Sequence, residues 1–179
     1  MADGVKAMVD AVDVPVTVKH RIGIDKEESY AFVRDFVGTV ADAGCRVFIV
    51  HARNAWLKGL SPKENREIPP LRYERVYQLK RDLPHLTIVL NGGVTTDEQS
   101  AEHLQHVDGV MLGREAYHHP WMMSGWDARF LGGAANPVTQ DGVEAAMGAY
   151  MQRELVGDGT PWPGIGGHQR GREPDARGA

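Results

Sequence analysis

Four short segments rich in β-branched and apolar residues alternate along this chain with segments of helical periodicity. The four segments are residues 14–21, 46–51, 86–91 and 108–112, and the helical patterns lie near 32–40, 73–81 and 96–106. The connections are far longer than hairpin turns, and strands joined by such crossovers pair in parallel. This order predicts an α/β fold with a parallel sheet, as in Rossmann-type sheets and α/β barrels.

Local signals indicate where the helices begin and end. Residues 25–28 resemble a capping box before the first helix, and Gly44 indicates its end. Thr96 and Gln99 form the same pattern before the third helix. A last helix is expected to end near residue 155, and the Gly- and Pro-rich residues 156–179 are expected to be disordered.

Each predicted strand ends in a glycine or a polar residue, which is where α/β proteins build their sites. No G-x-G-x-x-G motif follows the first strand, and this disfavours a dinucleotide-binding Rossmann fold. The chain has 179 residues, whereas a complete eight-stranded α/β barrel typically needs ~250.

Glycines and an arginine after the last two strands predict a phosphate site. Asn91, Gly92 and Gly93 follow one strand, and Gly113 and Arg114 follow the next. Glycine lets backbone N–H groups approach an anion, and Arg114 is expected to open a short helix whose positive end favours negative charge. The alternative is two structural glycine turns beside an exposed arginine.

Three further residues have competing interpretations. Lys19 shares a strand face with Thr17 and could hold a flavin, sugar or carbonyl oxygen, or it could simply be solvated. His51 ends an apolar strand, where a lone histidine is usually a hydrogen-bonded core residue. Cys45, the single cysteine, has no base beside it and is interpreted as a small core residue rather than a nucleophile.

A long basic connection, residues 52–72, follows the second strand. Residues 53–82 hold eight Lys or Arg against four Asp or Glu, a balance of +4 in a chain whose net charge is −4. The connection combines Trp56 with Lys63, Arg66 and other cations, and cations with an aromatic surface are typical of RNA binding. A solvated loop and helix is the alternative interpretation.

Composition excludes other classes. No apolar run is long enough to span a membrane, and residues 1–10 lack the pattern of a secretory signal. One cysteine allows no internal disulfide, and no Cys/His pair has zinc spacing, so we expect no metal site and a cytoplasmic location.

Several blocks resemble the tRNA-dihydrouridine synthases, most closely the A-type. The most specific is GLSPKENREIPPL at 59–71; the others are VTVKHRIGID at 16–25, FIVHAR at 48–53, NGG at 91–93 and DGVMLGREAY at 108–117. The similarity covers about residues 5–155. It implies the C-terminal half, strands five to eight, of an FMN-dependent (β/α)8 TIM barrel, followed by a helical tRNA-binding domain.

The resemblance also implies roles for individual residues. Family members use NADPH to reduce FMN, which passes hydride to a D-loop uridine, at positions 20 and 20a in the A-type. Carried over, Lys19 and His51 would contact the flavin, and Lys63 and Arg66 would contact tRNA. The phosphate would be held by Asn91, Gly92, Gly93, Gly113 and Arg114. The barrel part would span 1–135, and the helical domain would begin at 136–155.

The family's Gly-Cys-Pro segment and its catalytic cysteine have no match in this sequence. Cys45 does not replace that cysteine, so we expect a fragment that is inactive alone, read from an incomplete or truncated gene. Two exposed half-barrel edges would favour self-association. The other hypotheses are an RNA-binding relic without flavin and another FMN-barrel oxidoreductase.

Overall fold

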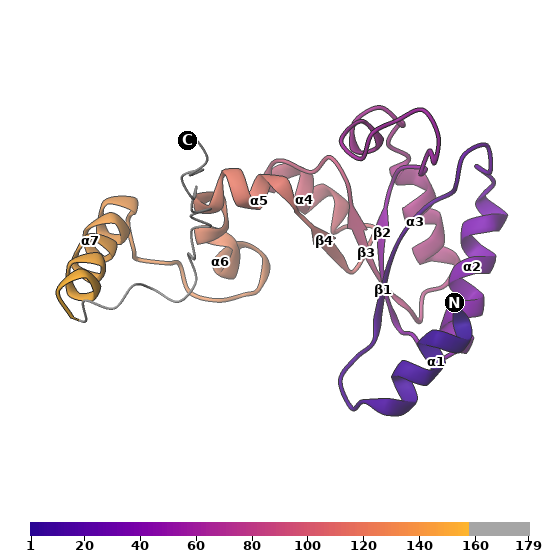
Figure 1. Cartoon of the computed structure of the whole chain (residues 1–179), viewed down its shortest axis with the longest axis horizontal. Coiled ribbons are helices and arrows are strands. Elements are labelled where there is room, and N and C mark those ends of the chain that lie inside the picture. The colour runs from indigo at the N-terminus through magenta and orange to yellow at the C-terminus, as the bar shows by residue number, and fades with distance from the viewer. Residues whose placement is uncertain (158–179) are drawn as a thin grey trace, which may run out of the picture. The chain divides into compact units, whose positions relative to one another are not determined.

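The computed structural model describes residues 1–157 (Figure 1). One compact unit spans Met1–Asn136, and a second begins at Pro137. Within the described residues, the second unit holds one helix, α7 (Gln140–Gly157). The tail predicted to be disordered, 156–179, lies outside the described residues except for the last two positions of α7.

A four-stranded parallel sheet forms the centre of the first unit. Its strands are β1 (Thr17–Arg21), β2 (Val47–His51), β3 (Thr87–Asn91) and β4 (Gly109–Met111), in the order β1-β2-β3-β4. A doubly wound sheet reverses its strand order, whereas a barrel keeps it. The predicted α/β class is therefore confirmed, and the unidirectional order is consistent with a partial TIM barrel.

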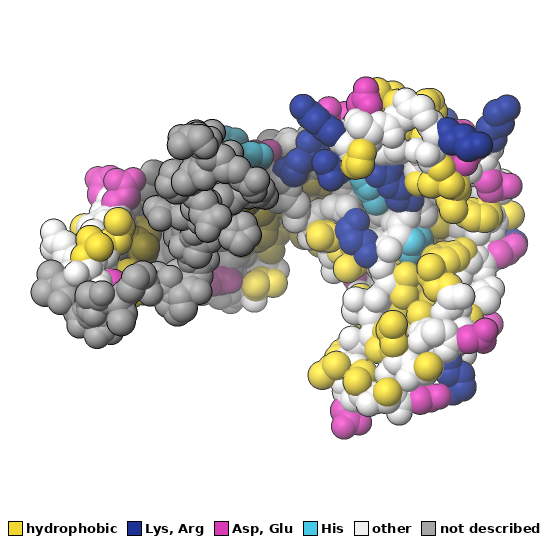
Figure 2. All heavy atoms as spheres, viewed as in Figure 1, with side chains coloured by type: hydrophobic (Ala, Val, Ile, Leu, Met, Phe, Trp, Pro, Cys, Tyr) yellow, Lys and Arg dark blue, Asp and Glu magenta, His cyan; other side chains and the backbone are white. Residues whose placement is uncertain are grey.

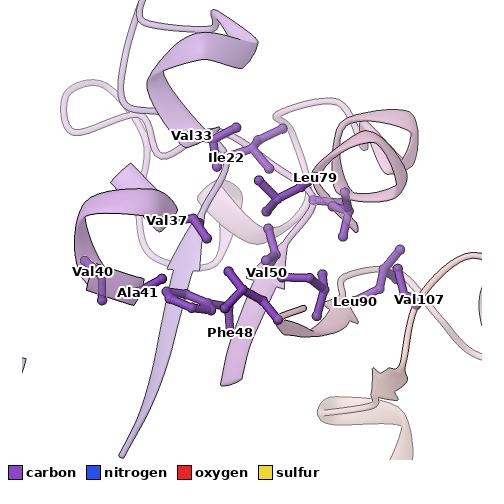
Figure 3. Close-up of a cluster of buried hydrophobic side chains, with 14 of the residues drawn as sticks. Ile22, Val33, Val37, Val40, Ala41, Phe48, Val50, Leu79, Leu90 and Val107 are labelled. Atoms are coloured by element: carbon purple, nitrogen blue, oxygen red, sulfur yellow. The ribbon is translucent and has the colours of Figure 1, made fainter. Parts of the chain in front are cut away.

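Helices connect the strands and cover one face of the sheet. They are α2 (Tyr30–Asp42), α3 (Tyr73–Asp82) and α4 (Asp97–His103), and α1 (Ala2–Ala11) precedes β1. The core fills the space beneath them: Phe48 and Val50 of β2 pack with Val37 and Leu79 from the helices (Figure 3). The unit thus has one helix-covered face and one face left to build a site.

The open face follows from the two-residue period of the strands. Lys19 is exposed and Ile49 and Val89 are half-buried, whereas Phe48 and Val50 are fully buried on the covered face. The register aligns Arg21, His51, Asn91 and Met111 in one row at the carboxyl ends of the four strands. Three residues of this row, His51, Asn91 and Met111, line the candidate site.

The capping prediction for the first helix was wrong. Ser29 caps α2, with its hydroxyl accepting from the Phe32 N–H at 3.3 Å. Asp25 instead adopts a φ of +52° in a turn, and its carboxylate accepts from the Leu57 N–H at 2.8 Å. The capping box of Thr96 and Gln99 at α4 is confirmed, although α4 ends at His103 rather than 106.

The sequence patterns missed several short elements. The 52–72 connection contains the 3-10 turn η1 (Glu64–Arg66). After the expected short helix α5 (Arg114–His118) come η2 (Pro120–Gly125) and α6 (Trp126–Phe130). None of the helices in the described part of the chain is long and apolar enough to cross a membrane.

Candidate functional site

A pocket of about 410 Å³ opens at the carboxyl ends of the strands. Its volume falls in the range of small-molecule sites, about 300–1,000 Å³. All seven residues predicted to bind cofactor line it: Lys19, His51, Asn91, Gly92, Gly93, Gly113 and Arg114. Arg66 also lines the pocket, but Lys63 does not.

The turn after β3 needs glycine at two successive positions. Gly92 has a φ of +117° and Gly93 a φ of +71°, which side-chain-bearing residues rarely adopt. A Cβ on Gly92 would lie 2.6 Å from Cδ2 of His51, and a Cβ on Gly93 would lie 2.7 Å from Cδ1 of Leu71. Glycine at these two positions therefore lets the turn pack directly against His51 and Leu71.

Asn91 and Arg114 connect the pocket to its surroundings. The Asn91 amide donates to the Met111 carbonyl at 2.8 Å and so joins the ends of β3 and β4. Arg114, the first residue of α5, forms an ion pair with Glu67 at 2.8 Å. The 52–72 loop is thereby tied to the start of α5.

Positive charge dominates the electrostatics around His51. Burial, followed by the cations Arg21, Lys19, Arg53 and Arg114, lowers the pKa of this histidine to about 4. Burial and the neighbouring Arg21 also lower the pKa of Lys19. His51 is therefore neutral near pH 7, and the cations around it make the pocket suitable for an anion.

The 52–72 loop is held by polar contacts with the strand ends. Arg21 donates to the carbonyl oxygens of Asn54 and Asn65, both at 2.7 Å. The Asn65 amide in turn pairs with both backbone polar groups of Trp56, at 2.8 and 2.6 Å. Arg53 donates to the carbonyl oxygens of Glu67 and Pro69. These contacts give the loop a defined shape beside the pocket.

Basic side chains gather at the end of the unit that carries this loop. Figures 1 and 2 together show Lys and Arg atoms clustered near the loop, with histidine atoms among them. Lys63 and Arg66 have no ion-pair partner among the described residues. The basic segment predicted from the sequence thus reaches the pocket through Arg66.

Some lining residues were not singled out from the sequence. They are Val94, Thr95, Met111, Glu115 and His118. Strand alternation could have identified Met111, because it lies in register with Asn91. Helical spacing could have identified His118, which lies one turn after Arg114 on α5. No pattern in the sequence distinguishes Thr95.

A phosphate group fits the glycine-rich end of the pocket. Among residues 1–157, no acceptor pairs with the Gly93 N–H. A Cβ built on Gly113 meets no atom within 4 Å, so the space beside that backbone is open. The arrangement of free N–H, open backbone and Arg114 suits an anion. Lys19 and His51 line the same pocket and could contact the remainder of a phosphate-bearing cofactor.

The single cysteine lies elsewhere. Cys45 is fully buried just before the amino end of β2, whereas the pocket lies at the carboxyl end. Its thiol points at the carbonyl oxygens of Val47 and Val16, at 3.3 and 3.5 Å. Within the described part of the chain, no group of three or more His, Cys, Asp or Glu side chains could hold a metal.

Comparison with known proteins places the chain in a family. The family model "Dihydrouridine synthase (Dus)" matches residues 1–155. The tRNA-dihydrouridine(20/20a) synthases of Salmonella typhi and Escherichia coli (strain K12) are 57% and 56% identical over 156 residues, 87% of this chain. That of Pseudomonas syringae pv. tomato is 57% identical over 160 residues, 89% of this chain.

The match covers only part of those relatives. The chain spans 47%, 45% and 48% of their lengths, about half of each. A crystal structure of a mandelate oxidase variant with benzoyl-formic acid aligns with a TM-score of 0.40 and 16% identity, over 61% of this chain and 41% of that one. That likeness is too weak to support an argument. The family match and the identities above suffice: this chain belongs to the dihydrouridine synthase family.

Proposed function

We propose that this chain forms the FMN- and tRNA-binding part of a tRNA-dihydrouridine synthase that acts on D-loop uridines 20 and 20a, with NADPH as the reductant. The observation that carries the proposal is the pocket, because one cavity collects every residue that the family resemblance assigns to the cofactor. Bound FMN would supply the hydride for reduction of the uridine ring.

Different residues of the pocket would bind different parts of the cofactor. Gly93, Gly113 and Arg114 would bind the phosphate through backbone N–H groups and a guanidinium. Lys19 would place a positive charge beside the flavin ring, where it can stabilise negative charge. His51, neutral near pH 7, would contact the flavin by a hydrogen bond rather than by charge.

The loop would hold the tRNA. Lys63 and Arg66 would contact phosphates, and Trp56, which is 36% exposed, offers an aromatic surface on which a base can stack. The target uridine would have to leave its stack to reach the flavin. Because Arg66 lines the pocket and Lys63 does not, Arg66 would lie closer to the extruded nucleotide.

These 179 residues alone would not complete the reaction. The only cysteine is Cys45. It is buried near the amino ends of the strands, whereas the pocket lies at their carboxyl ends, so it cannot protonate a substrate there. The four strands would be strands five to eight of the barrel, and α7 would begin the helical tRNA-binding domain. Unpaired edges at β1 and β4 would favour self-association in the isolated chain. A cytoplasmic location stays a prediction.

The proposal is tested by titrating the purified chain with FMN and with labelled tRNA. We expect quenching of flavin fluorescence on binding, salt-sensitive tRNA binding, and no dihydrouridine formation with NADPH. Arg114→Gln should weaken FMN binding, and Arg46→Gln, which changes a cation outside the pocket, should not. Binding of tRNA without any flavin binding would instead support the RNA-binding relic.

A further inference from the structure

Tyr73, in the first turn of α3, lies against the glycine turn but does not line the pocket. Its hydroxyl donates a hydrogen bond to the Gly92 carbonyl oxygen at 2.8 Å. Burial raises the pKa of Tyr73, so its hydroxyl keeps the proton that this bond needs. The same hydroxyl would lie 3.1 Å from a Cβ on Gly93. Tyr73 therefore packs against both glycines.

This hydrogen bond fixes the orientation of one peptide unit. The peptide bond between Gly92 and Gly93 is trans, so the Gly93 N–H points in the opposite direction to the Gly92 carbonyl. With the carbonyl held by Tyr73, the Gly93 N–H points away from α3, and no described residue accepts from it. Two consecutive glycines can otherwise rotate easily, because neither has a side chain that restricts it.

Tyr73 is itself held in place by buried aromatic side chains. Its ring centroid lies 4.5 Å from that of His103, which is 5% exposed. His103 is in turn fixed through Nδ1, 2.6 Å from the Tyr77 hydroxyl. Burial lowers the pKa of His103, which favours the neutral ring in this contact. The Tyr73 hydroxyl is thus a rigid donor rather than a mobile one.

We propose that Tyr73 is a positioning residue for the phosphate end of the cofactor, acting through the Gly92–Gly93 peptide. By holding the Gly92 carbonyl, it presents the Gly93 N–H to the phosphate before the ligand arrives. A donor that is oriented in advance avoids the entropic cost of ordering on binding. This inference rests on the proposed function, because it takes the pocket to bind a phosphate-bearing flavin.

The test compares FMN with riboflavin, which has the same ring system but lacks the phosphate. Affinities are measured by quenching of flavin fluorescence for the wild type, Tyr73→Phe and Tyr30→Phe. Tyr30→Phe is the matched control, because it removes a tyrosine hydroxyl that bonds Asp82 at the far end of α3 rather than a glycine. Melting temperatures report whether each variant remains folded.

Loss of one positioning hydrogen bond should lower the FMN affinity of Tyr73→Phe about threefold to tenfold. Riboflavin affinity should stay unchanged in that variant, and Tyr30→Phe should keep the wild-type ratio of the two affinities. Equal losses for both ligands, or no loss for FMN, would overturn the inference, because a purely structural role predicts no preference for the phosphate.

Inorganic phosphate separates this inference from the proposed function. A wild-type chain that binds no flavin refutes the proposed function, but phosphate can still occupy the glycine-rich end. We expect phosphate to raise the melting temperature of the wild type more than that of Tyr73→Phe. Equal shifts overturn the role of Tyr73, and a wild type that responds to neither flavin nor phosphate refutes both proposals.

Discussion

Glu67 and Arg114 form an ion pair at 2.8 Å between the basic loop and the first residue of α5. The pair places a carboxylate next to the guanidinium that is proposed to bind phosphate. The hydrogen bond that Arg114 donates is the main cause that lowers the pKa of the Glu67 carboxyl. Glu67 is therefore charged at neutral pH. A negative group therefore lies beside the cation that is proposed to bind phosphate, although Glu67 does not itself line the pocket.

Removing this charge should strengthen anion binding. Glu67→Gln keeps the side-chain length but no longer neutralises Arg114. Because exposed ion pairs are weak, we expect FMN affinity to rise only about twofold to fivefold, measured by fluorescence titration at low salt. Glu74→Gln, on α3 and outside the pocket, is the control and should leave the affinity unchanged. A lower affinity in Glu67→Gln would mean that the pair is needed to orient Arg114.

Alanine substitutions at Gly92 and Gly113 should affect the unfolding free energy and the FMN affinity differently. At Gly92 the new Cβ would clash with the His51 ring and the φ of +117° is unfavourable, so Gly92→Ala should lose about 1–3 kcal/mol of unfolding free energy. At Gly113 the space is open, so Gly113→Ala should remain more stable and yet weaken FMN binding. Urea unfolding and flavin titration measure the two effects. Equal unfolding free energies in the two variants would contradict this prediction.

The central sheet and its row of strand ends could be predicted from the sequence, because successive side chains of a strand point to alternate faces of the sheet. Alternation places Lys19 on the open face, and the parallel register then aligns Arg21, His51 and Asn91 at one edge. The pocket brings together the predicted cofactor residues for this reason. Their individual ligand roles, and the assignment to strands five to eight, stay predictions.

The shape of the loop could not be predicted, because its contacts join distant residues without any periodic pattern. Arg21 reaches the Asn65 carbonyl across 44 positions of sequence, and Asp25 holds the Leu57 N–H across 32. The second contact also explains the error at the start of α2. Asp25 serves the loop and leaves the capping position to Ser29.

The unusual pKa of His51 predicts how stability depends on pH. Its pKa is about 4 in the folded chain and 6.5 in an unperturbed histidine, so the unfolded chain binds more protons between these values. Stability should therefore rise with pH from about 4 to 6.5 and fall on acidification. His51→Gln removes this contribution, so acidification from pH 7 to 4.5 should destabilise the wild type more than the variant. Urea unfolding at both pH values measures the difference.

The exposed His85 provides the control for this effect. His85→Gln should lose as much stability on acidification as the wild type does. If His51→Gln and the wild type show the same pH dependence, the cations around His51 do not act on its ring as described. The half-buried His20 and the buried His103, whose pKa values burial also lowers, contribute in the same direction in all of these proteins and do not obscure the comparison.

Lys63 and Arg66 should differ in what their removal affects. Both lie in the basic loop, but only Arg66 lines the pocket. Lys63→Gln should therefore weaken tRNA binding and lower the slope of log affinity against log salt by about 1, the value for one lost phosphate contact, while FMN affinity stays unchanged. Arg66→Gln should weaken both ligands, since it removes a cation from the rim of the cofactor pocket. Fluorescence anisotropy of labelled tRNA across a salt series, with parallel FMN titrations, measures both effects. If the two variants had the same effect on FMN, the pocket would not distinguish these cations, and the placement of Arg66 nearest the extruded nucleotide would be wrong.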